Sequence, residues 1–194
     1  MLLCRLHLIV FLLPNPHSQK MNHDLAICPL DTTYREPLHA LANDPLVSRT
    51  SFVPHPCPVS LVDEWMASNH KPQTDRLFFA VLHKQAEVGL AMLKKIDYAR
   101  REAELAYWIG HPYWGRGFGL EAARHVMEHA FTKMDMQSLH SHCLRHGNPA
   151  SRKILEKLGF MPDPARADLP VEERYAQFFP GDSWMFFRIH KDAA

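Results

Sequence analysis

The pattern of apolar and polar residues predicts three consecutive strands in the middle of the chain. Residues 77–82 (LFFAVL) are almost wholly apolar, and residues 88–96 (VGLAMLKKI) and 103–109 (AELAYWI) follow after short polar connections. Runs of this length and composition are typical of buried strands. Because the connections are short, we expect the three strands to be antiparallel neighbours.

The pattern then changes to the period of a helix. Apolar residues recur every three or four positions from Leu120 to Met134, with charged and polar residues between them, which predicts an amphipathic helix of about four turns. Three further elements are expected: a strand at 138–144, a helix at 148–158 and a strand at 184–189. Together the elements predict an α/β domain whose sheet is mixed.

The segment before these strands is rich in proline and weakly patterned. A short helix is expected at 35–43, ending before Pro45, and a second helix is expected from Ser60, as its N-cap, to Asn69. Residues 161–182 contain four prolines, so we expect an irregular connection there, with a helical turn near 171–178.

The first twenty residues differ from the rest of the chain. Residues 1–13 (MLLCRLHLIVFLL) are nearly all apolar, but a membrane-spanning helix needs about 20 such residues. A second methionine, Met21, opens an ordinary polar start. We therefore expect residues 1–20 to lie outside the fold and residues 21–194 to form one domain. A translation start at Met21 explains this best, and a secretory signal or a structured apolar arm are the alternatives.

Composition excludes several classes of protein. The chain has 194 residues, of which 46% are apolar and 22% charged, so wholesale disorder is excluded. A net charge of +1 gives no global electrostatic case for binding nucleic acid or an anionic membrane. The four cysteines form no CxxC pair, which argues against a zinc ribbon or a disulfide framework. We expect a cytoplasmic protein without a membrane or nucleic-acid partner.

One loop has the composition of a phosphate-binding turn. Residues 111–122 (HPYWGRGFGLEA) place alternating glycines directly before the amphipathic helix. Their backbone amides could close on an anion at the positive end of the helix dipole, and Arg116 could add a full charge. The sequence contains neither GxxxxGK[ST] nor GxGxxG, so two familiar phosphate-binding motifs are absent. A flexible turn without a ligand is the alternative.

The segment YWIGHPYWGRGFGLEA, followed by NPASRKILEKLGF, resembles the GNAT superfamily of acetyl-CoA-dependent N-acyltransferases, and within it the RimJ/RimL type. The resemblance covers about residues 77–160 well and the flanking segments loosely. It implies a mixed, mostly antiparallel sheet, flanked by helices, in which the strand at 103–109 splays away from the strand at 138–144. It also implies that acetyl-CoA is the co-substrate and that no metal is needed.

The resemblance further implies where the cofactor lies. Pantetheine would contact the strand before the loop, and pyrophosphate would lie on the amides of the loop. In the family this loop reads Gln/Arg-x-x-Gly-x-Gly/Ala, and here Trp114 stands at the Gln/Arg position. The cofactor-binding residues expected from the resemblance are Tyr107, Trp108, Ile109, Trp114, Gly115, Arg116, Gly117, Phe118, Gly119 and Asn148.

The resemblance also suggests proton donors and acceptors. Many family members carry a tyrosine that protonates the leaving thiolate, but Leu155 stands at that position here. RimL-like enzymes use a serine three residues after the asparagine, which Ser151 matches, although a serine is also ordinary in a first helical turn. Glu104 is the expected acceptor of the amine proton, because it lies on the strand beside the proposed groove. A solvated strand glutamate is the alternative.

A covalent intermediate is not required for amine attack on a thioester, so we expect Cys143 to be a core residue. His140, His142 and His146 invite a metal-binding interpretation, but strand alternation turns Cys143 away from His140 and His142. No metal site is therefore expected.

Three functions are compatible with the sequence. The leading one is acetylation of a protein or peptide α-amine. The alternatives are acetylation of a small amine, such as a polyamine, amino acid or antibiotic, and non-catalytic sensing of acyl-CoA.

Residues 161–182 carry five acidic residues against two arginines. If this segment borders the acceptor side, basic acceptors would be preferred, although a solvated loop is the simpler alternative. The sequence does not determine the oligomeric state, and a homodimer is compatible with it.

Overall fold

The chain forms one mixed seven-stranded sheet within the residues that the computed structural model describes, 24–51, 53–166 and 179–194. The strand order is β1-β2-β3-β4-β5-β7-β6. The strands are β1 (Leu25–Pro29), β2 (Leu77–His83), β3 (Ala86–Asp97), β4 (Glu102–Ile109), β5 (Ser138–Leu144), β6 (Met161–Pro162) and β7 (Trp184–His190). The helices are α1 (Arg35–Ala42), α2 (Pro45–Thr50), α3 (Val59–Ser68), α4 (Phe118–Thr132) and α5 (Pro149–Lys157).

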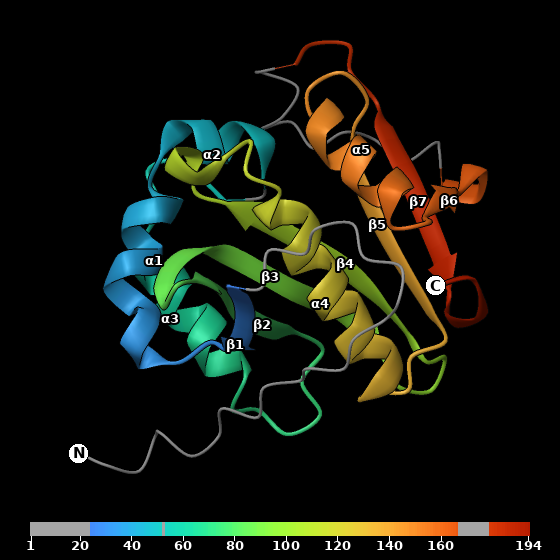
Figure 1. Cartoon of the computed structure of the whole chain (residues 1–194), viewed down its shortest axis with the longest axis horizontal. Helices are drawn as coiled ribbons and strands as arrows, with labels where there is room; N and C mark the ends of the chain where they lie inside the picture. The colour runs from blue at the N-terminus through green and yellow to red at the C-terminus, as the bar shows by residue number, and fades with distance from the viewer. Residues whose placement is uncertain (1–23, 52, 167–178) are drawn as a thin grey trace.

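The central strand pair diverges, as the resemblance predicts. All neighbouring strands are antiparallel except β4 and β5, which are parallel and pair only through Glu102–Glu104 and Ser138–His140. Beyond this short register the two strands separate, and Figure 1 shows them close at one end and apart at the other. At the fork, the Ser141 hydroxyl donates a hydrogen bond to the Leu105 carbonyl at 2.8 Å.

Helices cover both faces of the sheet because its strands are apolar on both sides. One buried cluster joins Leu105 and Ile109 of β4 to the apolar stripe of α4 and to Leu155 of α5. A second cluster joins Phe78, Met92 and Trp108 to residues of α1 and α3, including Leu38 and Val62. Figure 1 shows α4 crossing the face that is toward the viewer.

The predicted central strands, β5, β7, α1, α4 and α5 are all present with small shifts of their ends. Three elements were not predicted: β1, α2 and β6. Pro45, which was expected only to stop α1, begins α2, and the Asp44 carboxylate caps that helix by accepting from the Leu46 amide at 2.8 Å. The prediction that Ser60 is an N-cap is wrong, because α3 already begins at Val59 after Pro58.

Several predictions lie outside the described residues: the status of residues 1–20 and the helical turn near 171–178. In the described part of the chain, no helix is both long and apolar enough to span a bilayer.

One buried carboxylate makes the stability of the fold depend on pH. Glu87 of β3 is 9% exposed, and its two carboxylate oxygens have no hydrogen-bond partner among the described residues. Burial raises the pKa of Glu87 to about 8 from its ordinary value of 4.5. The folded protein therefore keeps this proton over a pH range in which the unfolded chain loses it.

We expect the contribution of Glu87 to stability to be fully present below about pH 4.5 and to be lost as the pH rises to about 8. The loss over this window is on the order of 5 kcal/mol. Urea unfolding of the wild type and Glu87→Gln at pH 5 and pH 8 measures it: the variant should be the more stable protein at pH 8 only. Equal pH dependence of the two proteins would contradict the prediction.

Candidate active site

A cleft of about 680 Å³ opens where β4 and β5 separate. Its walls come from both faces of the sheet, so it has two halves. We call the side toward α4 and α5 the cofactor half, and the side toward α1 and α3 the acceptor half. Odd-numbered residues of β4, such as Leu105 and Tyr107, face the cofactor half, whereas Glu104, Ala106 and Trp108 face the acceptor half.

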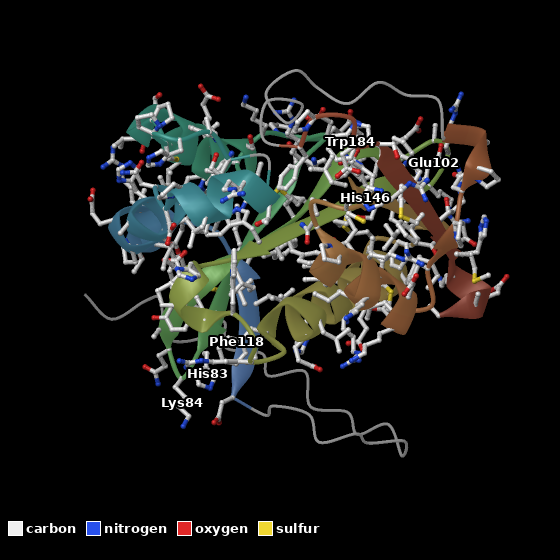
Figure 2. The ribbon with its side chains drawn as sticks, turned by 90° about the horizontal axis from the view of Figure 1, so that it is seen from above. His83, Lys84, Glu102, Phe118, His146 and Trp184 are labelled. Carbon is white, nitrogen blue, oxygen red and sulfur yellow. The ribbon has the colours of Figure 1, made fainter. Side chains whose placement is uncertain are left out.

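The glycine turn lies at the end of the cofactor half. Gly117 is the N-cap of α4 with φ +81°, and no side chain caps this helix. The first amides of any helix lack intrahelical acceptors, so here they remain available for an anion at the positive end of the helix dipole. Phe118 anchors the turn because it is buried and its ring lies 4.6 Å from that of His83 (Figure 2).

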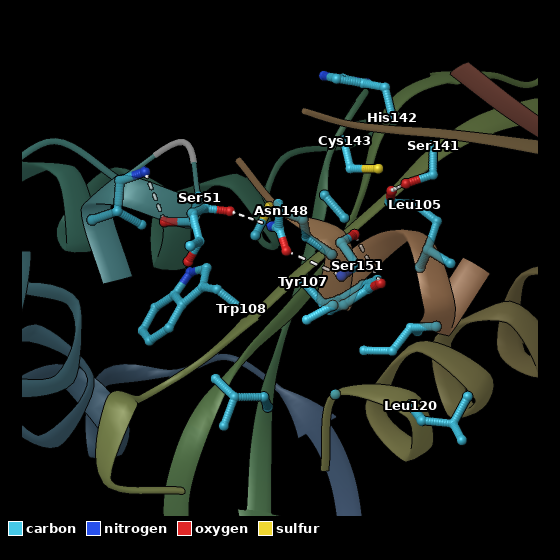
Figure 3. Close-up of a pocket in the computed structure, with 18 of the residues that line it drawn as sticks. Ser51, Leu105, Tyr107, Trp108, Leu120, Ser141, His142, Cys143, Asn148 and Ser151 are labelled. Atoms are coloured by element: carbon cyan, nitrogen blue, oxygen red, sulfur yellow. Dashed lines mark hydrogen bonds between the residues drawn. The ribbon is translucent and has the colours of Figure 1, made fainter. Parts of the chain in front are cut away.

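The middle of the cofactor half carries a fixed pair of hydroxyls. The Asn148 carboxamide oxygen accepts a hydrogen bond from the Ser151 amide at 3.0 Å, and its nitrogen donates to the Thr50 carbonyl at 2.9 Å. This holds the start of α5 against α2. The Tyr107 hydroxyl lies 3.2 Å from the Ser151 hydroxyl oxygen (Figure 3). Burial raises the pKa of Tyr107, so its hydroxyl is protonated at neutral pH.

Eleven of the twelve residues predicted from the sequence line this one cleft. They are Glu104, Tyr107, Trp108, Ile109, Trp114, Gly115, Gly117, Phe118, Gly119, Asn148 and Ser151. Arg116 does not line it, because its guanidinium lies over the Tyr113 ring, 5.7 Å from the ring centroid. Trp114, at the position where the family carries Gln or Arg, turns its indole nitrogen inward and donates to the Ile109 carbonyl at 2.6 Å.

Glu104 is buried between two lysines. Its carboxylate oxygens lie 2.7 Å from the Lys94 ammonium and 2.8 Å from the Lys95 ammonium. Burial alone would raise the pKa of Glu104, but the charges of Lys94 and His142 and the hydrogen bonds from both lysines outweigh it and lower the pKa to about 2. Glu104 is therefore ionised at neutral pH, and a carboxylate with so low a pKa is a weak proton acceptor.

Two polar side chains that the sequence did not single out for catalysis lie in the cleft. The His142 Nδ1 atom is 3.8 Å from a Glu104 oxygen, and its ring packs edge-on against Trp184. The Tyr107 hydroxyl reaches Ser151 from a strand, whereas the sequence pointed only to the backbone of Tyr107. The signal for His142 was its alternation with His140, which pairs with Glu104 in the sheet.

Cys143 lies in the wall of the cleft, and burial raises the pKa of its thiol to about 12. It therefore remains a neutral thiol, which is a poor nucleophile. Across the described part of the chain, no group of three or more His, Cys, Asp or Glu side chains is arranged to hold a metal ion.

Two acids of the 161–182 segment are engaged in structural contacts. The Asp182 carboxylate accepts from the amides of His146 and Gly147, and Asp163 pairs with Arg188 at 3.3 Å. The other three, Asp168, Glu172 and Glu173, lie outside the described residues, so the expected acidic rim has no structural description here.

The cleft lies in a forked sheet and ends at a helix N-terminus without a side-chain cap, an arrangement that suits an extended ligand carrying phosphate. The acetyltransferase (GNAT) domain model matches residues 24–161, and the chain belongs to this family. The expected fold is thereby confirmed.

Individual relatives agree with this family. YdaF of Bacillus subtilis (strain 168), provisionally named a ribosomal N-acetyltransferase, is 30% identical over 81 residues, which are 42% of this chain and only 44% of YdaF. Spermidine N(1)-acetyltransferase of Escherichia coli (strain K12) is 29% identical over 149 residues, 76% of this chain and 75% of that protein. The structure of spermidine N-acetyltransferase from Vibrio cholerae in complex with CoA and spermine has a TM-score of 0.72 at 20% identity, covering 88% of this chain and 97% of that one.

Proposed function

We propose that this protein is an N-acetyltransferase of the RimJ/RimL type that transfers the acetyl group of acetyl-CoA to a primary amine. The observation that carries the proposal is the cleft itself, because it joins an uncapped helix N-terminus to a forked strand pair and opens to both faces of the sheet. A ligand with phosphates at one end and a thioester at the other suits such a cleft, and membership of the family supports it.

The chemistry is direct attack of a neutral amine on the thioester carbonyl. A bond forms between the amine nitrogen and the acetyl carbon, the bond from that carbon to sulfur breaks, and the amine loses a proton while the thiolate gains one. Backbone amides of β4 beyond its pairing with β5 are suited to stabilise the oxyanion. No covalent enzyme intermediate is needed, in keeping with the neutral Cys143 thiol.

The two proton transfers lie in opposite halves of the cleft. For the thiolate we propose Ser151, supported by Tyr107, as the donor in the cofactor half. For the amine we propose that Glu104 works through His142, because a carboxylate with a pKa of about 2 is a weak proton acceptor and the His142 ring lies 3.8 Å from it. The ionised Glu104 then stabilises the imidazolium that forms.

The acetyl acceptor is less well defined than the acetyl donor. The likeness to YdaF supports a peptide α-amine, and the likeness to spermidine acetyltransferase supports a small amine. The experiment that tests the function is release of free thiol from acetyl-CoA with a panel of amines and peptides. Release that requires an amine supports the enzyme, whereas tight CoA binding without release under any acceptor supports the acyl-CoA sensor.

We expect His142→Asn to lower kcat/KM by about 10²-fold or more, because it removes the ring that would accept the amine proton. Glu104→Gln should also lower kcat/KM, because it removes the negative charge that would stabilise the imidazolium. The matched control is His146→Asn, which changes an exposed histidine beyond the end of β5. An unchanged kcat/KM in both cleft variants would mean that water takes the proton.

A further inference from the structure

We propose that the acceptor half takes a primary amine that carries a carboxylate on an aromatic or apolar body, and that Arg76 recognises this carboxylate. The inference rests on the proposed acetyltransferase function and names its acceptor. It comes from the charges and the aromatic wall of the cleft rather than from the relatives.

The charges that line the cleft are unbalanced. Among the described lining residues Glu104 is the only carboxylate, whereas Arg76, Lys94, Lys153 and Lys157 are cationic. Arg76 and Lys94 belong to the acceptor half. Phe78 lies two positions after Arg76 and Met92 lies two positions before Lys94, and both face this half. The single carboxylate is already engaged by two lysine ammoniums at 2.7 and 2.8 Å.

A polyamine does not suit this arrangement. Beyond its reacting nitrogen it carries further ammonium groups, and each would need a carboxylate or cation-binding surface. Within the described lining, Glu104 is the only carboxylate that could pair with an ammonium, and a polyamine would have to displace Lys94 or Lys95 from it. Arg76 and Lys94 would also repel it, and like charges at an interface reject a wrong partner.

An anionic acceptor suits it well. The Arg76 side chain is 59% exposed, and its one ion pair among the described residues, to the exposed Asp75 at 3.6 Å, is weak and easily exchanged. Its guanidinium can bind a carboxylate through two parallel hydrogen bonds. It also lies on the face that carries Glu104 and His142, beside the proposed route of the amine proton.

The aromatic wall fits the rest of the acceptor. Trp65 stacks on Phe78 with ring centroids 6.0 Å apart, and the ring centroids of Trp65 and Trp108 are 6.4 Å apart. The three rings form a continuous apolar surface. Trp108 is 6% exposed, and its indole nitrogen has no hydrogen-bond partner among the described residues although the residue lines the cleft. A buried donor without a partner is costly, so a ligand oxygen that reached this nitrogen would be bound favourably.

The experiment compares matched acceptors by thiol release: phenylalanine against phenethylamine, and C-terminally amidated Phe-Glu-Gly against Phe-Gln-Gly and Phe-Lys-Gly, with spermidine alongside. We expect the carboxylate-bearing member of each set to have the highest kcat/KM. Arg76→Gln should lower its kcat/KM about tenfold or more, with little effect on the uncharged members. Arg100→Gln makes the same change of charge on the β3–β4 connection and should change nothing. Phenylalanine tests the carboxylate of a free amino acid, and the peptides test the carboxylate of an acidic side chain, so the two sets distinguish these two sources.

Calorimetric titration of the CoA-loaded protein with the same acceptors provides a second, independent measurement. Transfer that favours spermidine, or a preference untouched by Arg76→Gln, would overturn this inference and leave the proposed function standing. Absence of transfer to every amine would overturn the proposed function, and the binding preference alone would then decide the inference. Equal binding of the carboxylate-bearing and the uncharged acceptors would refute the inference.

Discussion

Gly117→Asp is expected to weaken the binding of CoA by about two orders of magnitude while leaving the fold intact. Gly117 has φ +81°, a conformation that aspartate and asparagine tolerate better than most residues, and a Cβ added there meets no atom within 4 Å. The substitution therefore introduces little strain. A carboxylate about 5 Å from a phosphate costs about 3 kcal/mol at an effective dielectric constant of about 20. Since about 1.4 kcal/mol is a factor of ten, this corresponds to about 10²-fold.

The matched control for this prediction is Gly117→Asn, which adds a side chain of the same shape without charge. Calorimetry with CoA should give the asparagine variant a dissociation constant much closer to that of the wild type. Raising the salt concentration should narrow the gap between the two variants, because the repulsion is partly screened. If both variants bind CoA like the wild type, the phosphates do not lie on this turn.

The cofactor half could be predicted from the sequence because its residues are close together in the chain. The glycine turn, the start of α4 and the Asn148-Ser151 segment are local features whose spacing and caps can be recognised without knowing the fold. The period of apolar residues likewise predicted the central strands, β5, α4 and α5. Local patterns of this kind decide the element type, and the short connections decide which strands are neighbours.

The acceptor half could not be predicted in the same way, because its contacts join residues far apart in the chain. The sequence identifies Glu104 only as a glutamate on a predicted strand. The register of β3 and β4 is needed to reveal that Lys94 lies opposite it. Arg76 precedes its strand and looks like an ordinary surface residue until the fold brings it to the cleft. The elements missed near the N-terminus, β1 and α2, are short and are held by tertiary contacts and a cap rather than by a periodic pattern.

Arg116 shows that the position of a residue in the sequence does not determine where its charge lies. The sequence places it between two glycines of the turn, where a cation would be expected to add to the attraction for phosphate. In the structure its guanidinium lies over the Tyr113 ring, 5.7 Å from the ring centroid. We therefore expect the backbone amides of the turn to provide the main attraction for an anion, and the Gly117 substitution is the sharper test.

Ser151→Ala is expected to lower kcat by a factor on the order of 10²–10⁴, with the dissociation constant for CoA nearly unchanged. The hydrogen bond that starts α5 uses the Ser151 backbone amide and the Asn148 side chain, so the alanine variant keeps it. The substitution thus removes one hydroxyl, 3.2 Å from that of Tyr107, and little else. Leu155 occupies the helix position at which a tyrosine could otherwise serve, so no tyrosine of α5 replaces it.

Tyr107→Phe tells whether the two hydroxyls act as a unit. If Tyr107 passes a proton to Ser151, the single variants and the double variant should all lose activity to a similar extent, because residues that act together are not additive. The leaving group provides the decisive measurement: an aryl thioester, whose thiol is far more acidic than that of CoA, needs no proton on departure. We expect Ser151→Ala to transfer acetyl from such a thioester at nearly the wild-type rate. An equal loss with both thioesters would show that Ser151 positions the substrate and does not supply the proton.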